Sequence, residues 1–101
     1  MDQLTKELQA FLVQIHYTPD VVSHKVLHYI EHLTHLLEVE DEEMVLHYFG
    51  ILEHEQLSLD EIARKRKESP EETMSRIDEC LRKLAVTPEW QMVKQFAVKS
   101  S

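Results

Sequence analysis

The sequence predicts an all-helical fold, and three observations lead to this prediction. Apolar residues recur every three to four positions along most of the chain, which is the spacing of one face of an α-helix. Each of the three prolines follows a threonine or a serine, where a helix can begin. The chain has one glycine, so it lacks the residues that tight β-hairpin turns need. We therefore expect five to six short amphipathic helices in a compact bundle, forming a single domain over residues 1–101.

Three helices are predicted in the N-terminal half. The first covers about residues 3–16, where leucine, isoleucine and phenylalanine share one face. The second begins at Thr18–Asp20 and runs to about Leu37, because a capping hydroxyl, a proline and an acid that complements the helix dipole follow one another there. The third covers about residues 41–53, with its apolar side chains turned inward.

Three more helices are predicted in the C-terminal half. The segments Ser58–Glu61 and Ser69–Glu72 each place a serine three residues before a glutamate. This is the capping box, in which the hydroxyl and the carboxylate each satisfy a free backbone N–H group. We expect helices at about residues 59–67 and 70–84, and a last helix that starts at Thr87–Trp90.

The charge of the chain is uneven. Residues 1–57 contain two lysines and eleven acids, a net charge of −9, while residues 58–101 contain nine basic residues and eight acids, a net charge of +1. An acidic half repels a nucleic-acid backbone, so only the half at residues 58–99 is expected to touch one. We therefore distinguish an acidic helical half from a C-terminal half.

Several classes of protein are disfavoured. No glycine-rich phosphate loop and no Ser-His-Asp set can be found, so we expect neither an enzyme nor a cofactor. Cys80 falls at the edge of an apolar stripe, where it is expected to be a small core residue. A lone cysteine, the lack of a membrane-length apolar run and a start unlike a signal peptide together favour the cytoplasm.

Histidines recur on one face of the second predicted helix. Four of them fall within about 80° of one another on a helical wheel, opposite the apolar stripe. They are His24, His28, His32 and His35. Histidines at positions i and i+4 are able to bind zinc or a similar ion, but a metal site needs three or four converging ligands. A solvated face is therefore the preferred interpretation, and the same outward orientation is expected for His47 and His54.

Residues 42–84 carry motifs in an order that resembles a known protein family. The matching segments are Val45-Leu46, Phe49–Ile51 (FGI), Leu57–Ile62 (LSLDEI), Ser69, Ile77-Asp78 and Leu81–Leu84 (LRKL). Their order is similar to that in region 4 of the sigma-70 family of RNA polymerase sigma factors. The resemblance implies a helix-turn-helix, whose first helix crosses the DNA backbone and whose second enters the major groove, and it also implies contact with an RNA polymerase element.

Departures from the family pattern lead to two structural expectations. Lys67 stands where the family has a turn glycine, so its backbone should adopt the left-handed conformation. Met74 should fill the space that the family gives to the residue at Thr73, which would rotate the second helix by about 100°. That helix would then present its acids outward, to a protein partner. Ile62, Ile77 and Leu81 should pack together beneath it with Met74.

The candidate contact residues for DNA or a protein partner lie in and after the basic run "RKRK". They are Arg64, Lys65, Arg66, Lys67, Glu71, Thr73, Arg76, Arg82 and Lys83. A solvated charged face is the alternative interpretation of this run.

Three functional hypotheses follow. The first is a non-enzymatic, transcription-associated regulator that acts through RNA polymerase, a sigma factor or promoter DNA. The second is an acidic helical adaptor, inhibitor or chaperone that binds a protein partner through a helix face, with a homodimer left open. Its apolar contacts would come from Leu27, Leu36, Leu46 and Met92. The third is a metal binder built on the histidines.

Overall fold

A computed structural model describes residues 2–99, and within this range the chain forms α-helices and one short 3₁₀ helix, with no strand. The prediction of an all-helical bundle is confirmed. The elements are α1 (Gln3–Tyr17), η1 (Pro19–Val21), α2 (His24–Thr34), α3 (Val39–Phe49), α4 (Leu59–Arg66), α5 (Pro70–Ala85) and α6 (Pro88–Lys99). The radius of gyration is 13.1 Å, which matches the value of about 13 Å expected for a compact chain of this length.

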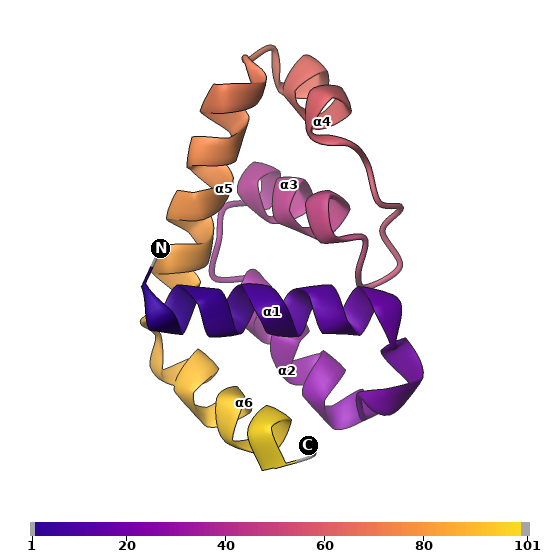
Figure 1. The fold of residues 1–101 in the computed structure, drawn as a ribbon, viewed down its shortest axis with the longest axis vertical. Coiled ribbons are helices and arrows are strands. Elements are labelled where there is room, and N and C mark those ends of the chain that lie inside the picture. The colour runs from indigo at the N-terminus through magenta and orange to yellow at the C-terminus, as the bar shows by residue number, and fades with distance from the viewer. Residues whose placement is uncertain (1, 100–101) are drawn as a thin grey trace.

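The helices pack around α1, which crosses the middle of the molecule (Figure 1). α5 packs against α1, α3 and α4, whereas α6 packs mainly against α2. Figure 1 accordingly shows α3, α4 and the start of α5 on one side of α1, and α2 with α6 on the other side. The helices that resemble a helix-turn-helix therefore lie at one end of the molecule.

A continuous apolar core joins both sides of α1. Leu8 and Ile30 have no exposed surface, and Trp90 of α6 is 1% exposed. The rings of Phe11 and Trp90 lie 5.8 Å apart between their centroids, and an ion pair of 2.6 Å joins Lys94 to Glu7 nearby. Full burial of a large apolar side chain contributes about 1.5–3 kcal/mol, so these contacts hold α6 against α1.

α2 begins later than the sequence predicted. Thr18 ends α1 instead of starting a helix, because both its backbone N–H and its hydroxyl donate to the carbonyl of Gln14, at 2.8 and 2.9 Å. Pro19–Val21 form only the 3₁₀ turn η1, and the true cap is Ser23, whose Oγ accepts a hydrogen bond from the N–H of Val26. The predicted start at Thr18 is therefore wrong.

α2 also ends earlier than predicted, at Thr34 and not at Leu37. The Thr34 hydroxyl bonds to the carbonyl of Glu31 at 3.0 Å and to the carboxylate of Glu42 at 2.9 Å. Glu42 also pairs with the imidazole of His35 at 2.6 Å. These contacts fasten the end of α2 to the first turns of α3.

α3 ends at Phe49, four residues before the predicted end, because Gly50 adopts the left-handed conformation with φ 64°. The backbone then stays irregular as far as Ser58, and Leu52 and Glu53 also have positive φ angles, of 53° and 66°. We refer to residues 50–58 as the α3–α4 loop.

Three imidazoles hold the α3–α4 loop in place. The Nδ1 atoms of His16, His47 and His54 lie 2.8–2.9 Å from the carbonyl oxygens of Gly50, Glu55 and Leu52, respectively. The rings of His47 and His54 also meet edge to face, 5.0 Å apart. Both rings are half-buried and line surface hollows instead of joining the apolar core. His54 lies beyond the end of α3, so its predicted place on the helix is wrong.

The loop also changes which leucines are exposed. Leu46 was predicted to be exposed but is buried, and the floor of one surface hollow contains it together with Leu52 of the loop. Leu27 is partly buried against the core, whereas Leu36 and Met92 are about half exposed. None of the described helices is both long and apolar enough to cross a membrane.

Candidate partner-binding site at the helix-turn-helix

One capping box begins α4 and a second begins α5. Ser58 and Ser69 each accept a hydrogen bond from the backbone N–H three residues later, and the carboxylates of Glu61 and Glu72 each accept a hydrogen bond from the backbone N–H of the cap residue. Both predicted boxes are confirmed. Each cap typically contributes about 1 kcal/mol.

The turn between the helices contains three residues and depends on Lys67. Its backbone is left-handed, with φ 58° and ψ 44°, and its N–H donates to the carbonyl of Arg64 at 3.2 Å. The next N–H, from Glu68, reaches back to Ala63 at 3.0 Å. The expectation that Lys67 takes the conformation of a turn glycine is confirmed, and α4 and α5 are two separate helices joined by a short turn (Figure 1).

Thr73, and not Met74, faces the centre of the helix pair. Thr73 has no exposed surface, and its hydroxyl bonds to the carboxylate of Glu68 at 3.1 Å. Met74 is only partly buried and touches the Tyr48 hydroxyl at 3.8 Å through its sulfur. The predicted substitution of Met74 for Thr73, with its rotation of α5, is therefore wrong. A polar side chain is tolerated in the core because Glu68 satisfies its hydroxyl.

Below Thr73, Ile62, Ile77 and Leu81 are each at most 3% exposed, so the small core predicted for the helix pair is present apart from Met74. Because Thr73 lies within this core, it does not belong to the contact surface for which the sequence nominated it.

An ion-pair network ties the helix-turn-helix to α3. Arg66 bonds to Glu68 at 2.6 Å and to Asp41 at 3.4 Å, and its Nη1 also donates to the carbonyl of Glu40 at 3.3 Å. Partial burial lowers the pKa of the Arg66 guanidinium, but the hydrogen bonds and charges of Glu68 and Asp41 outweigh this effect and raise it overall. The same hydrogen bond from Arg66 lowers the pKa of Glu68.

Arg76 of α5 also approaches Asp41, at 3.8 Å, and Glu79, at 3.8 Å. Arg66 and Arg76 were nominated as contacts for phosphates, but both take part in internal ion pairs. The remaining nominated cations are exposed and lie on two helices and the turn. They are Arg64, Lys65, Lys67, Arg82 and Lys83.

The N-terminal part of α5 is acidic on its outer side. Glu71 and Glu72 are exposed in the first turn, and Glu79 is exposed two turns later. In a DNA-binding helix-turn-helix this end of the second helix faces base edges, which offer mostly acceptors to the protein. Carboxylates there are poorly suited to base recognition, whereas they suit a basic surface on a protein.

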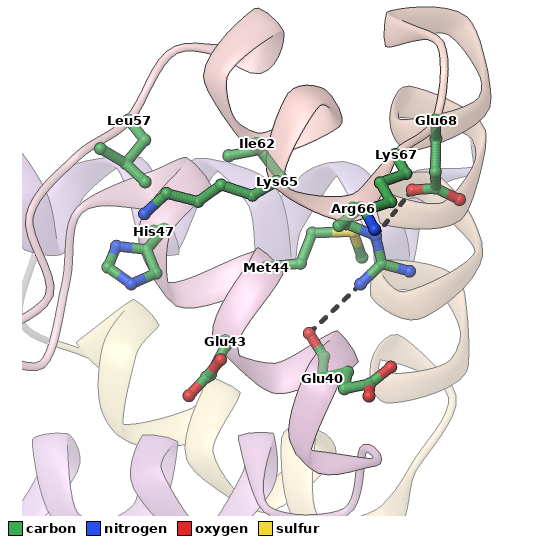
Figure 2. Close-up of a pocket in the computed structure, with 10 residues that line it drawn as sticks. All are labelled: Glu40, Glu43, Met44, His47, Leu57, Ile62, Lys65, Arg66, Lys67 and Glu68. Carbon is green, nitrogen blue, oxygen red and sulfur yellow. Dashed lines mark hydrogen bonds and ion pairs between the residues drawn. The ribbon is translucent and has the colours of Figure 1, made fainter.

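A cleft of about 460 Å³ opens between α3, α4 and the α3–α4 loop. Figure 2 shows Lys65 extending from α4 towards His47 of α3, with Glu40 and Glu43 along α3. Met44, Leu57 and Ile62 add an apolar lining. The cleft therefore offers charges of both signs beside an apolar surface.

Sequence reasoning found the basic side of this cleft but missed its acidic side. The run at residues 64–67 was visible as a block of charge, whereas Glu40 and Glu43 belong to a helix far away in the sequence. Only the packing of α3 against α4 brings the two together.

The four histidines of the α2 stripe face outward, and all are exposed. The Nε2 atoms of His28 and His32 lie 3.1 Å apart, while His35 pairs with Glu42. Within residues 2–99, no three histidine, cysteine, aspartate or glutamate side chains converge as a metal site would require.

Cys80 lies in the core at 4% exposure. Burial raises the pKa of its thiol to about 11, so the thiolate is scarce at neutral pH. The placement of Cys80 as a core residue is confirmed.

Comparison of the chain with protein-family models, with curated proteins and with solved structures finds no match.

Proposed function

We propose that this chain is a non-enzymatic regulatory protein of transcription that acts in the cytoplasm by binding a protein, either RNA polymerase or a sigma factor, through the α4–α5 helix-turn-helix. The observation that carries the proposal is the capped helix pair with the left-handed Lys67 at its turn, because this is the local geometry that the resemblance to sigma region 4 implies.

Protein binding is favoured over DNA reading by the charges of α5. Glu71 and Glu79 project from the helix that would have to enter the major groove, and two of the arginines expected to neutralise phosphates are held by Asp41 and Glu68. The cleft beside α4 adds an apolar surface. The apolar side chains of a peptide segment would cover this surface, whereas a charged phosphate backbone would not.

The test is binding of the immobilised full chain to purified bacterial RNA polymerase core enzyme, to a free sigma-70 factor and to a promoter duplex, each at low and at moderate salt. We expect binding to one of the two proteins, and a loss of about tenfold or more for a Glu71→Ala, Arg82→Ala double variant. Glu89→Ala, an exposed acid at the start of α6, is the matched control and should change affinity by less than about twofold.

Two results would change the conclusion. Salt-sensitive binding to the duplex that falls when Arg64, Lys65 and Lys67 are replaced by alanine would make the protein a DNA binder. Binding to none of the three probes would remove the transcription assignment. The second candidate, an acidic adaptor for another protein, would then be preferred, and the net charge of −9 on residues 1–57 supports it.

A further inference from the structure

A second surface lies away from the helix-turn-helix, between α2, the start of α3 and the α3–α4 loop. Two hollows of about 470 and 400 Å³ open there, and they share Glu31 and Leu52 as lining residues. Because they share these residues, we treat them as one depression and call it the α2 groove.

The lining of the α2 groove combines apolar side chains with acids. Leu27, Leu46 and Leu52 are apolar lining residues, and Val39, which is 72% exposed, lines the smaller hollow. Covering the apolar surface of an open groove with another apolar surface lowers the free energy, because both surfaces are removed from water.

The acids of the groove are Glu31, Glu42, Glu43 and Glu53. Glu42 is engaged by His35 and Thr34, while the other three are exposed. No lysine or arginine occurs among the residues that line the two hollows, in contrast to the cleft beside α4. A cation in this groove would therefore meet several carboxylates and no competing fixed positive charge.

We propose that the α2 groove binds a basic amphipathic helix of a partner protein. Its apolar face would cover Leu27 and Leu52, and its lysines or arginines would pair with Glu31, Glu43 and Glu53. α2 has 11 residues and is therefore about 16 Å long, which matches about three turns of a bound helix. Of the residues that line this groove, only Glu43 also lines the cleft beside α4, and the proposal does not depend on the transcription assignment.

The backbone of the loop has an unusual conformation where it lines the groove. Leu52 and Glu53 both have positive φ angles, which residues with a Cβ rarely adopt. The bonds from His16 to Gly50 and from His54 to Leu52 hold this backbone. The groove is thus formed before a partner arrives, which reduces the entropic cost of binding.

The test uses fluorescence anisotropy with the full chain and a labelled leucine–lysine amphipathic peptide of about 16 residues, long enough to form a helix. A peptide of the same composition in scrambled order is the reference, and it should bind at least about tenfold more weakly. Leu52→Asn keeps a residue that tolerates positive φ but removes the apolar contact, so it should weaken binding about tenfold.

Charge reversal separates the groove from a general attraction to an acidic protein. Glu31→Lys changes an exposed acid that lines both hollows but not the cleft beside α4, and it should weaken binding about fivefold. Glu89→Lys changes the net charge equally and should have less than about a twofold effect. Equal effects of the two variants, or equal binding of the ordered and scrambled peptides, would overturn the proposal. A wild-type dimer that Leu52→Asn converts to a monomer would also overturn it, because a second copy would then occupy the groove.

Discussion

Replacing Gly50 with alanine should destabilise the protein strongly. A Cβ atom at this position would lie 2.6 Å from the Cβ of Gln56 and 2.9 Å from the Nδ1 atom of His16. It would also lie 3.1 Å from the Cα atom of Gln56. Because this atom belongs to the backbone, rotating a side chain cannot relieve the clash. The φ angle of 64° adds a conformational cost, because residues with a Cβ avoid the left-handed region.

The size of the effect follows from three contributions. The left-handed backbone costs roughly 1–2 kcal/mol for alanine, and overpacking costs roughly 1–3 kcal/mol. Alanine also has less conformational freedom than glycine in the unfolded chain, and this difference stabilises the folded state by about 0.4–1 kcal/mol. The free energy of unfolding should therefore fall by roughly 2–4 kcal/mol, which is a large share of the 5–15 kcal/mol typical of a domain.

Urea unfolding followed by circular dichroism measures this change. With a slope of about 1.5 kcal/mol per molar, the midpoint should fall by roughly 1–3 M. Gly50→Asn is the informative control, because asparagine tolerates positive φ but still carries a Cβ, and it should be about 1 kcal/mol more stable than the alanine variant. A Gly50→Ala protein within about 0.5 kcal/mol of the wild type would show that the close approach of the loop is not as described.

Three further predictions concern the helix-turn-helix and its surroundings. Lys67→Gly should raise the free energy of unfolding by about 0.5–1 kcal/mol, because it removes a left-handed residue with a Cβ, whereas Lys65→Gly in the last turn of α4 should lower it by about 0.5–1 kcal/mol; a loss in both variants would contradict the left-handed turn. Cys80 should react with an aromatic disulfide reagent at about pH 8 no faster than the chain unfolds, because its thiol is buried with a pKa of about 11; rapid labelling of the folded protein would refute this. The hydrogen bond from Arg66 lowers the pKa of Glu68 in the folded state. The stabilisation that this pair provides is therefore present above the pKa of Glu68 in the unfolded chain, and it is lost as the pH falls from about 5 to about 3. Denaturation curves of Glu68→Gln over that range should therefore be flatter with pH than those of the wild type, and an equal slope would count against the pair.

Local sequence signals predicted the parts of the fold that depend on neighbouring residues. Both capping boxes were predictable, because each depends on side chains and backbone groups three residues apart. The left-handed Lys67 was instead expected from the resemblance to sigma region 4, where a glycine occupies the turn. The start of α2 was not predicted, since Thr18 satisfies the signals for beginning a helix and for ending one equally well. Its bond to Gln14 shows which of these roles it takes.

The features that were mispredicted depend on packing and side-chain bonds that the helical period of the sequence does not show. Leu46 is buried although its position in α3 suggested exposure, because the loop lies against that side of the helix. Thr73 is buried because Glu68 supplies a partner for its hydroxyl, and helical periodicity alone would assign the position to an apolar neighbour. The end of α3 is different, since the single glycine of the chain marked it and the apolar spacing through Leu52 was given more weight.

The histidine bonds of the α3–α4 loop determine where each ring carries its hydrogen. A carbonyl oxygen only accepts hydrogen bonds, so Nδ1 of His16, His47 and His54 must be the protonated nitrogen of the neutral ring. Nε2, on the opposite edge of each neutral ring, is then the nitrogen that accepts hydrogen bonds. Each of these histidines therefore joins the loop through its donor atom and keeps an acceptor atom for another contact.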